Sequence, residues 1–307
     1  MKKYRILTLC LCIVTGGFYA MEHDIDAIIK KGFKDEDSSH IDTNLDKQVT
    51  LTSKYAILME QQSGEILFRK HDKEKMHPAS MTKIMTVYLA IQHVQDLNEM
   101  ITISPDIFPY LEQENASMAG FLPYQKVSIK DLLYGALLSS GAEACETLAM
   151  QISGSEDDFV KLMNKEAKRI GMTDTHFSNC TGLDEDDHVS SVYDIGLLLR
   201  EALKDDTFST IFQTKSYYTQ PSVEYPDGFM MTSTMWQTMQ QHDISSPYLI
   251  GGKTGYTLDA GLCLASQGKV QGKYYLFISA NAKGDATTKP YHILDAKHMY
   301  ETLANQR

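Results

Sequence analysis

Cysteine is scarce in this sequence, and no cysteine or histidine spacing is typical of a metal site. Five cysteines occur among 307 residues, and none of them stands in a Cys-x-x-Cys pair. Such pairs are typical of zinc sites and redox motifs. We therefore expect no metal and no cofactor, and we interpret the cysteines as small buried thiols.

Positive charge is also scarce. The chain has 29 lysine and arginine residues against 40 aspartate and glutamate residues, which gives a formal net charge of −11. Binding to nucleic-acid phosphates requires a basic surface. The charge balance therefore argues against nucleic acid as a partner.

Long hydrophobic runs are missing except near the N-terminus. Lys2, Lys3 and Arg5 precede a largely apolar run over residues 6–20. A positive segment followed by an apolar run shorter than the about 20 residues of a membrane helix is typical of a secretory signal. We expect residues 1–20 to be a signal peptide or an N-terminal anchor, and the protein to be exported. The chain ends within its last predicted helix, so we expect any tether to be N-terminal.

Residues 21–48 are rich in charge and lack a sustained apolar period, so we interpret them as a linker before a domain over 49–307. Two segments, 55–59 and 65–68, are predicted to form a hairpin, and 261–265 and 274–279 a second strand pair. Periodicity and caps predict helices between and after them. Three of the expected helices cover residues 81–94, 191–203 and 293–304. Two more are indicated by caps: one begins at Ser128 with its partner Asp131, and the other begins at Ser155 with its partner Asp158 and ends at Gly171.

This order of elements predicts a mixed α/β fold. Sequential strands without helical crossovers form an antiparallel sheet. The helices before the second strand pair form an inserted all-helical lobe. Because the first and last thirds of the chain share the sheet, we expect one domain with two lobes.

Ser80 and Lys83 are candidate catalytic residues. Pro78 lies just ahead of the helical pattern, so Ser80 is expected near a helix N-terminus. Residues three apart share a helix face, which places the lysine amine beside the serine hydroxyl. A lysine whose pKa is lowered by burial can take the serine proton and create a nucleophile. The same spacing recurs at Ser266 and Lys269, where glycine and strand alternation break the geometry, so we interpret that copy as chance.

A Lys253-Thr254-Gly255 segment stands immediately before the second strand pair and occurs once in the chain. A serine–lysine helix followed by a Lys-Thr-Gly strand is typical of penicillin-binding proteins and active-site serine β-lactamases. The ammonium of Lys253 and the hydroxyl of Thr254 can bind a substrate carboxylate. Gly255 leaves room for substrate along the strand edge.

With these motifs, the chain resembles the D-alanyl-D-alanine carboxypeptidases among the low-molecular-mass penicillin-binding proteins, over about residues 50–307. The similarity extends to segments 56–60, 117–118, 122–123, 128–133, 179–183 and 187–190. It implies the β-lactamase/transpeptidase-like fold, removal of the terminal D-alanine from peptidoglycan stem peptides, and acylation by β-lactam antibiotics. It also implies Ser80 as the nucleophile, Lys83 as its base, and the backbone N–H groups of Ser80 and Tyr256 as an oxyanion hole. The corresponding location is the periplasm or the outer face of the cytoplasmic membrane.

The sequence departs from this family at two points. The third motif, usually Ser-x-Asn, falls on Ser140-Gly-Ala142. Ser140 can still relay protons to the leaving group, but Ala142 cannot make the hydrogen bonds of an asparagine, and Glu143 is adjacent. Relatives also commonly offer an arginine near the start of the last helix, whereas residues 281–300 contain none and leave Lys289 or His292.

Two alternatives remain open at this point. A serine β-lactamase would need an acid that activates water opposite Ser80, and the acidic stretch 184–188 offers candidates. A protein that binds or is acylated by muropeptides and penicillins without turnover would fit the alanine in the third motif. Action on cross-links cannot be separated from carboxypeptidase action by the sequence.

Overall fold

The computed structural model describes residues 45, 48–285 and 287–306. The expected signal peptide and most of the expected linker lie outside this range. Leu45, near the end of that linker, is buried against the domain, and its carbonyl accepts a hydrogen bond from the N–H of Val49. Among these residues, no helix is long and apolar enough to cross a membrane.

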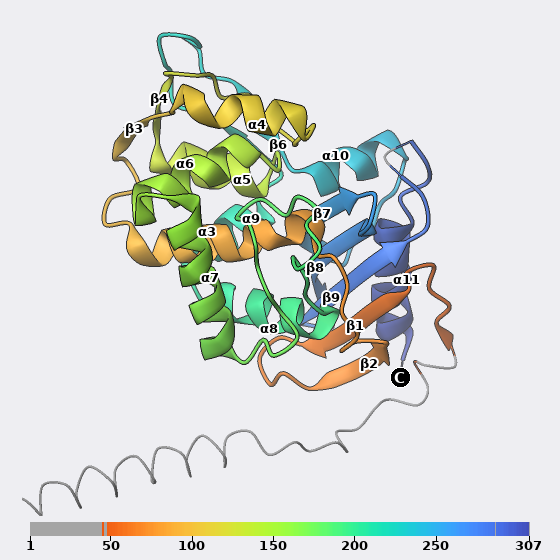
Figure 1. Cartoon of the computed structure of the whole chain (residues 1–307). Coiled ribbons are helices and arrows are strands. Elements are labelled where there is room, and N and C mark those ends of the chain that lie inside the picture. Colours follow the sequence, from red (N-terminus) through yellow and green to blue (C-terminus); the bar gives the residue numbers. More distant parts are fainter. Residues whose placement is uncertain (1–44, 46–47, 286, 307) are drawn as a thin grey trace, which may run out of the picture. The chain divides into compact units, whose positions relative to one another are not determined.

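The described domain contains a five-stranded antiparallel sheet, with α11 (Tyr291–Asn305) on one side and most other helices on the other (Figure 1). Its strand order is β2-β1-β9-β8-β7, so the first hairpin pairs with the last strand of the chain. The five strands are β1 (Tyr55–Glu60), β2 (Ile66–Lys70), β7 (Leu249–Thr257), β8 (Gly261–Val270) and β9 (Lys273–Ala282). The expected antiparallel sheet shared by the two ends of the domain is therefore confirmed.

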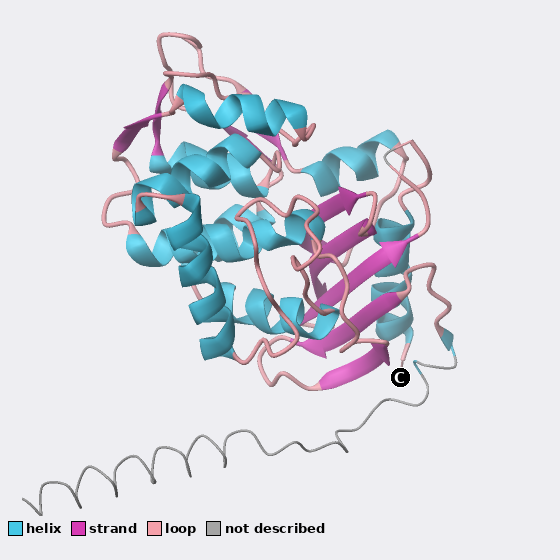
Figure 2. Cartoon of the chain, in the orientation of Figure 1, coloured by secondary structure: helices cyan, strands magenta, loops and turns pink. Residues whose placement is uncertain are grey.

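Helices, two small strand pairs and the loops between them make up the rest of the described domain (Figure 2). The small pairs are β3 (Met100–Thr102) with β4 (Lys126–Ser128), and β5 (Ser216–Tyr218) with β6 (Met230–Thr232). The helices are η1 (Ala79–Thr82), α3 (Lys83–His93), η2 (Pro105–Ile107), α4 (Phe108–Gln113), α5 (Ile129–Leu137), α6 (Ala142–Ser153), α7 (Glu156–Ile170), α8 (Val192–Ala202), α9 (Asp206–Gln213), α10 (Thr234–Gln241) and α11 (Tyr291–Asn305).

The predicted helix starts are confirmed by their caps. The side chains of Ser128, Ser155 and Ser191 accept hydrogen bonds from backbone N–H groups three residues later, which satisfies donors that a helix N-terminus leaves free. Gly171 ends α7 in the left-handed conformation, as a helix C-terminus favours.

The side chains of a strand alternate between the two faces of a sheet. In this sheet, both faces carry buried apolar side chains that pack against helices. Along β1, Ile57 and Met59 contribute to the core shared with α8 and α3, whereas Ala56 and Leu58 contribute to the core shared with α11. Each core is made of apolar side chains removed from water, which is the main favourable contribution to folding. The sheet is thereby fixed between two layers, and its edge strand β7 contacts η1.

Candidate active site

Ser80 lies in η1, one short turn before the long helix α3. Its hydroxyl oxygen is 3.0 Å from the Nζ of Lys83, the first residue of α3. The expected pairing of the two side chains is therefore present. Ala79, directly before the serine, has a φ of 48°, a strained conformation that is common at functional sites and costs on the order of 1–3 kcal/mol.

Lys83 is buried, with only 3% of its surface exposed. Burial disfavours the charged amine and lowers the pKa of Lys83 from its usual value. Its Nζ also donates a hydrogen bond to the backbone carbonyl of Thr181 at 2.5 Å. A buried amine with a lowered pKa beside a serine hydroxyl has the properties of a general base.

Ser140 and Lys253 meet on the other side of the site. The Nζ of Lys253 donates to the Oγ of Ser140 at 2.9 Å and to the carbonyl of Thr254 at 2.7 Å. Burial and the nearby charge of Lys83 lower the pKa of Lys253 well below its usual value. A substrate carboxylate bound beside Lys253 would restore its charge, because an opposite charge favours the ammonium form.

Thr254, Gly255 and Tyr256 lie on β7, the edge strand that faces η1. A Cβ atom on Gly255 would be 3.0 Å from the Cβ of Ala79 and 3.0 Å from the backbone nitrogen of Ser80. The close approach of η1 therefore favours glycine here, a more specific reason than the room for substrate expected from the sequence. This approach brings the backbone of Gly255 next to that of the nucleophile.

The carboxyl group of Glu143 is bound to the backbone of the segment 119–121. Its Oε1 accepts hydrogen bonds from the backbone N–H groups of Ala119, Gly120 and Phe121 at 2.7, 3.0 and 3.2 Å. Glu143 therefore fixes the segment that follows Ser117 and does not replace the amide missing at position 142. Its other oxygen, Oε2, is buried without a partner, and burial raises the pKa of this carboxyl group.

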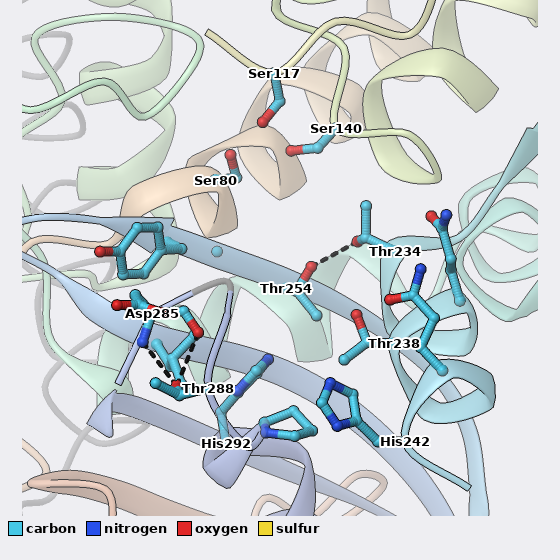
Figure 3. A pocket seen from close by; sticks show the side chains of 16 residues that line it. Ser80, Ser117, Ser140, Thr234, Thr238, His242, Thr254, Asp285, Thr288 and His292 are labelled. Carbon is cyan, nitrogen blue, oxygen red and sulfur yellow. Dashed lines mark hydrogen bonds between the residues drawn. The ribbon is translucent and has the colours of Figure 1, made fainter. Parts of the chain in front are cut away.

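Two cavities meet at Ser80. One of about 360 Å³ extends from Ser80 and Ser140 past Thr254 to α10 and the start of α11. The other, of about 390 Å³, lies beside Lys83, Ala142 and the 181–184 segment. Figure 3 shows the first cavity, with Ser80, Ser117 and Ser140 facing Thr254 across it.

Two features of the cavity were not predicted from the sequence. Thr234, at the start of α10, forms a 2.5 Å hydrogen bond between its hydroxyl and that of Thr254. The carbonyl of Thr181 holds Lys83. Neither a helix hydroxyl nor a backbone carbonyl belongs to a sequence motif. The only sequence indication was the resemblance of segment 179–183, which contains Thr181.

His292 lines the same cavity near the start of α11, whereas Lys289 is not among its lining residues. The ring is 4% exposed, its Nδ1 has no hydrogen-bond partner, and burial lowers the pKa of His292 to about 4. It is therefore a neutral group at neutral pH. It cannot supply the fixed positive charge of an arginine.

One group of side chains among the described residues has the composition of a metal site. Glu146, Glu156 and Cys180 place one ligand atom each within 4.8 Å of one another. Burial and the neighbouring carboxyl group of Glu156 raise the pKa of Glu146 to about 8. The carboxyl group of Glu146 therefore carries a proton at neutral pH.

The fold and these residues have the arrangement expected of the active-site serine class of penicillin-binding proteins and β-lactamases. The sequence profile of the D-alanyl-D-alanine carboxypeptidase family, peptidase S11, matches residues 42–283. The chain belongs to this family. Ser140 of the third motif and Thr254 and Gly255 of the Lys-Thr-Gly segment line the same cavity as Ser80.

Curated relatives and solved structures agree with this assignment. The chain is 35% identical over 221 residues to D-alanyl-D-alanine carboxypeptidase DacF of Bacillus subtilis, covering 71% of this chain and 54% of that protein. It is 32% identical over 226 residues to DacC of Escherichia coli K12, covering 70% and 54%. The chain thus spans about half the length of these relatives. The crystal structure of the Streptomyces K15 DD-transpeptidase matches with a TM-score of 0.73 and 26% identity, covering 83% of this chain and 97% of that one.

Proposed function

We propose that this protein is a serine-type D-Ala-D-Ala carboxypeptidase that trims peptidoglycan stem peptides through an acyl-enzyme on Ser80. The observation that carries the proposal is the 3.0 Å contact between the Ser80 hydroxyl and the amine of the buried Lys83. The names of the relatives support the substrate class, and β-lactams are the corresponding covalent inhibitors.

Acylation begins when the Ser80 oxygen attacks the carbonyl carbon of the penultimate D-alanine. The new C–O bond forms as the hydroxyl proton passes to the neutral amine of Lys83. Negative charge develops on the former carbonyl oxygen. The N–H groups of Ser80 and Tyr256 would stabilise that charge; they belong to η1 and β7, whose backbones approach closely at Gly255.

Collapse of this intermediate breaks the C–N bond and releases D-alanine. The departing nitrogen needs a proton, and Ser140 can give its own and recover one from the ammonium of Lys83. Lys253 and Thr254 hold the terminal carboxylate of the leaving D-alanine. Water then attacks the ester and restores Ser80.

Two acids of the 184–188 stretch give little support to the β-lactamase alternative. The carboxylate of Glu185 accepts a hydrogen bond from the side chain of Asn179, and that of Asp187 accepts one from Ser178. Both acids thus take part in the loop's own structure. Asp184, which lines the second cavity together with Ser80 and Lys83, is the acid of this stretch that the β-lactamase alternative would need to activate water.

We also propose that the protein is exported and acts at the cell wall, on the basis of the apolar run at residues 6–20 and the substrate class. Fractionation of cells tests this location. Full-length protein found in the cytoplasm, with residues 1–20 retained, would contradict it.

The test of function combines a labelled penicillin with a D-Ala-D-Ala pentapeptide. We expect the wild type to be labelled at Ser80 and to release D-alanine, and Ser80→Ala to do neither. Ser266→Ala serves as the matched control, because Ser266 has the same spacing to a lysine but lies buried inside β8. Labelling without D-alanine release would favour the non-catalytic alternative, and a label mapped elsewhere would refute the nucleophile.

A further inference from the structure

The chemistry of a lysine base sets a geometric requirement on Lys83. A neutral amine has two N–H groups and one lone pair, and the lone pair must face the serine hydroxyl to accept its proton. At least one N–H therefore needs a fixed acceptor elsewhere. Ala142, on the third motif, offers no side-chain acceptor, and the carbonyl of Thr181 at 2.5 Å is the acceptor present.

The Thr181 carbonyl is fixed by the side chain of Asn179. The amide oxygen of Asn179 accepts hydrogen bonds from the N–H of Thr181 at 3.2 Å, from its hydroxyl at 3.2 Å and from the N–H of Gly182 at 2.7 Å. Its Nδ2 donates to the carbonyl of Leu183 at 3.0 Å and to the carboxylate of Glu185 at 2.8 Å. Asn179 is 3% exposed, and both ends of its amide are fully used.

The same turn is held against the nucleophile. Gly182 has a φ of 84°, and a Cβ there would lie 2.0 Å from the carbonyl oxygen of Ala79, so the two backbones are in direct contact. The carbonyl of Cys180, the residue before Thr181, accepts a 2.6 Å hydrogen bond from the hydroxyl of Thr86 in α3. A shift of the turn would therefore change the position of the Thr181 carbonyl relative to both Lys83 and Ser80.

We propose that Asn179 is a positioning residue for the base. By ordering the turn 179–183 it fixes the Thr181 carbonyl, which holds one N–H of Lys83 and directs the lone pair toward Ser80. This inference rests on the proposed function, because it requires Lys83 to act as the base.

The experiment measures the rate of acylation by labelled penicillin as a function of pH. Asn179→Ala removes the acceptor for the turn, and we expect acylation to slow by at least about tenfold, the equivalent of one hydrogen bond to a reacting group. Asn179→Asp keeps the oxygen acceptor but places negative charge near Lys83. This charge favours the ammonium form, so the acid limb of the pH profile should move to higher pH.

Asn164→Ala is the matched control. Asn164 also anchors this loop by its amide, accepting from the N–H of Phe177 at 2.9 Å and donating to its carbonyl at 2.7 Å. Unlike Asn179, its side chain makes these hydrogen bonds before the turn 179–183 and not within it. With rates normalised to folded protein by circular dichroism, we expect the control to keep the wild-type rate and pH profile.

Two results would overturn the inference. If both Asn179 variants keep the acylation rate and pH profile of the wild type, then Asn179 has only a structural role. The same holds if both variants have the rate and pH profile of Asn164→Ala. If the wild type itself is not acylated at Ser80, the proposed function fails and the inference fails with it. The wild-type measurement therefore distinguishes failure of the proposed function from failure of the inference alone.

Discussion

His188 is expected to make the stability of this protein depend on pH in a way that one substitution can isolate. Its ring is 1% exposed, and its Nδ1 accepts a hydrogen bond from the N–H of Ser178 at 3.0 Å. The proton of the neutral ring is therefore on Nε2, which donates to the hydroxyl of Thr82 at 2.8 Å. Burial is the main cause that lowers the pKa of His188 to about 3.

The sign of the effect follows from this lowered pKa. Below pH 6.5, the ordinary value, the unfolded chain binds a proton at His188 that the folded chain does not. The free energy of unfolding therefore decreases as the pH falls from 6.5 toward 3. The loss is about 1.4 kcal/mol per pH unit, or about 2 kcal/mol between pH 6.5 and pH 5.

The assay compares urea unfolding of the wild type and His188→Gln, a variant that cannot titrate. The wild type should be the more stable of the two at about pH 7.5, and the difference should shrink by about 2 kcal/mol at about pH 5. Other shifted groups act equally on both proteins. These include His292, whose pKa is lowered to about 4, and Glu146, whose pKa is raised to about 8 and has the opposite sign. If the difference in the free energy of unfolding between the two proteins is the same at both pH values, the assignment of His188 as a neutral, buried imidazole is wrong.

Three further substitutions test the site itself. Lys83→Arg replaces the amine by a guanidinium that stays protonated and so cannot act as the base. Penicillin acylation measured by label incorporation should therefore fall at least about a hundredfold, and a near-normal rate would rule out this base. Ala142→Asn supplies the missing amide and should raise D-alanine release about ten- to hundredfold while changing penicillin acylation less, and a slower variant would show that another group has taken that role. Gly255→Ala places a Cβ 3.0 Å from Ala79 and from the nitrogen of Ser80, so it should lower stability by about 1–3 kcal/mol and slow acylation. A thermal midpoint and an acylation rate both equal to wild type would contradict that account.

The elements that the sequence predicted correctly are those with a local signature. The capped helices beginning after Ser128, Ser155 and Ser191 have a side chain that satisfies their first N–H groups, and this chemistry is readable from four residues. The strands β8 and β9 were found too, although both extend several residues beyond the expected bounds. Their ends are set by pairing with neighbours, which a single segment does not reveal.

Short elements and backbone contacts escaped prediction for the same reason. The strands β5 and β6 have three residues each, too few for alternation to be recognised. The contact of Glu143 with the N–H groups of 119–121 spans more than 20 residues of sequence. The motifs thus located Ser80, Lys83, Ser140 and Lys253, whereas the groups that hold them in place depend on tertiary structure.

The hydrogen bond between Lys253 and Ser140 joins two differently built parts of the molecule. Lys253 belongs to the edge strand of the sheet, and Ser140 lies in the turn between α5 and α6. Separating the edge strand from the turn between α5 and α6 is a local opening, and a local opening needs less free energy than unfolding the whole domain. In increasing urea, enzyme inactivation should therefore precede the loss of helical signal, and a penicillin that bridges Ser80 and β7 should delay it.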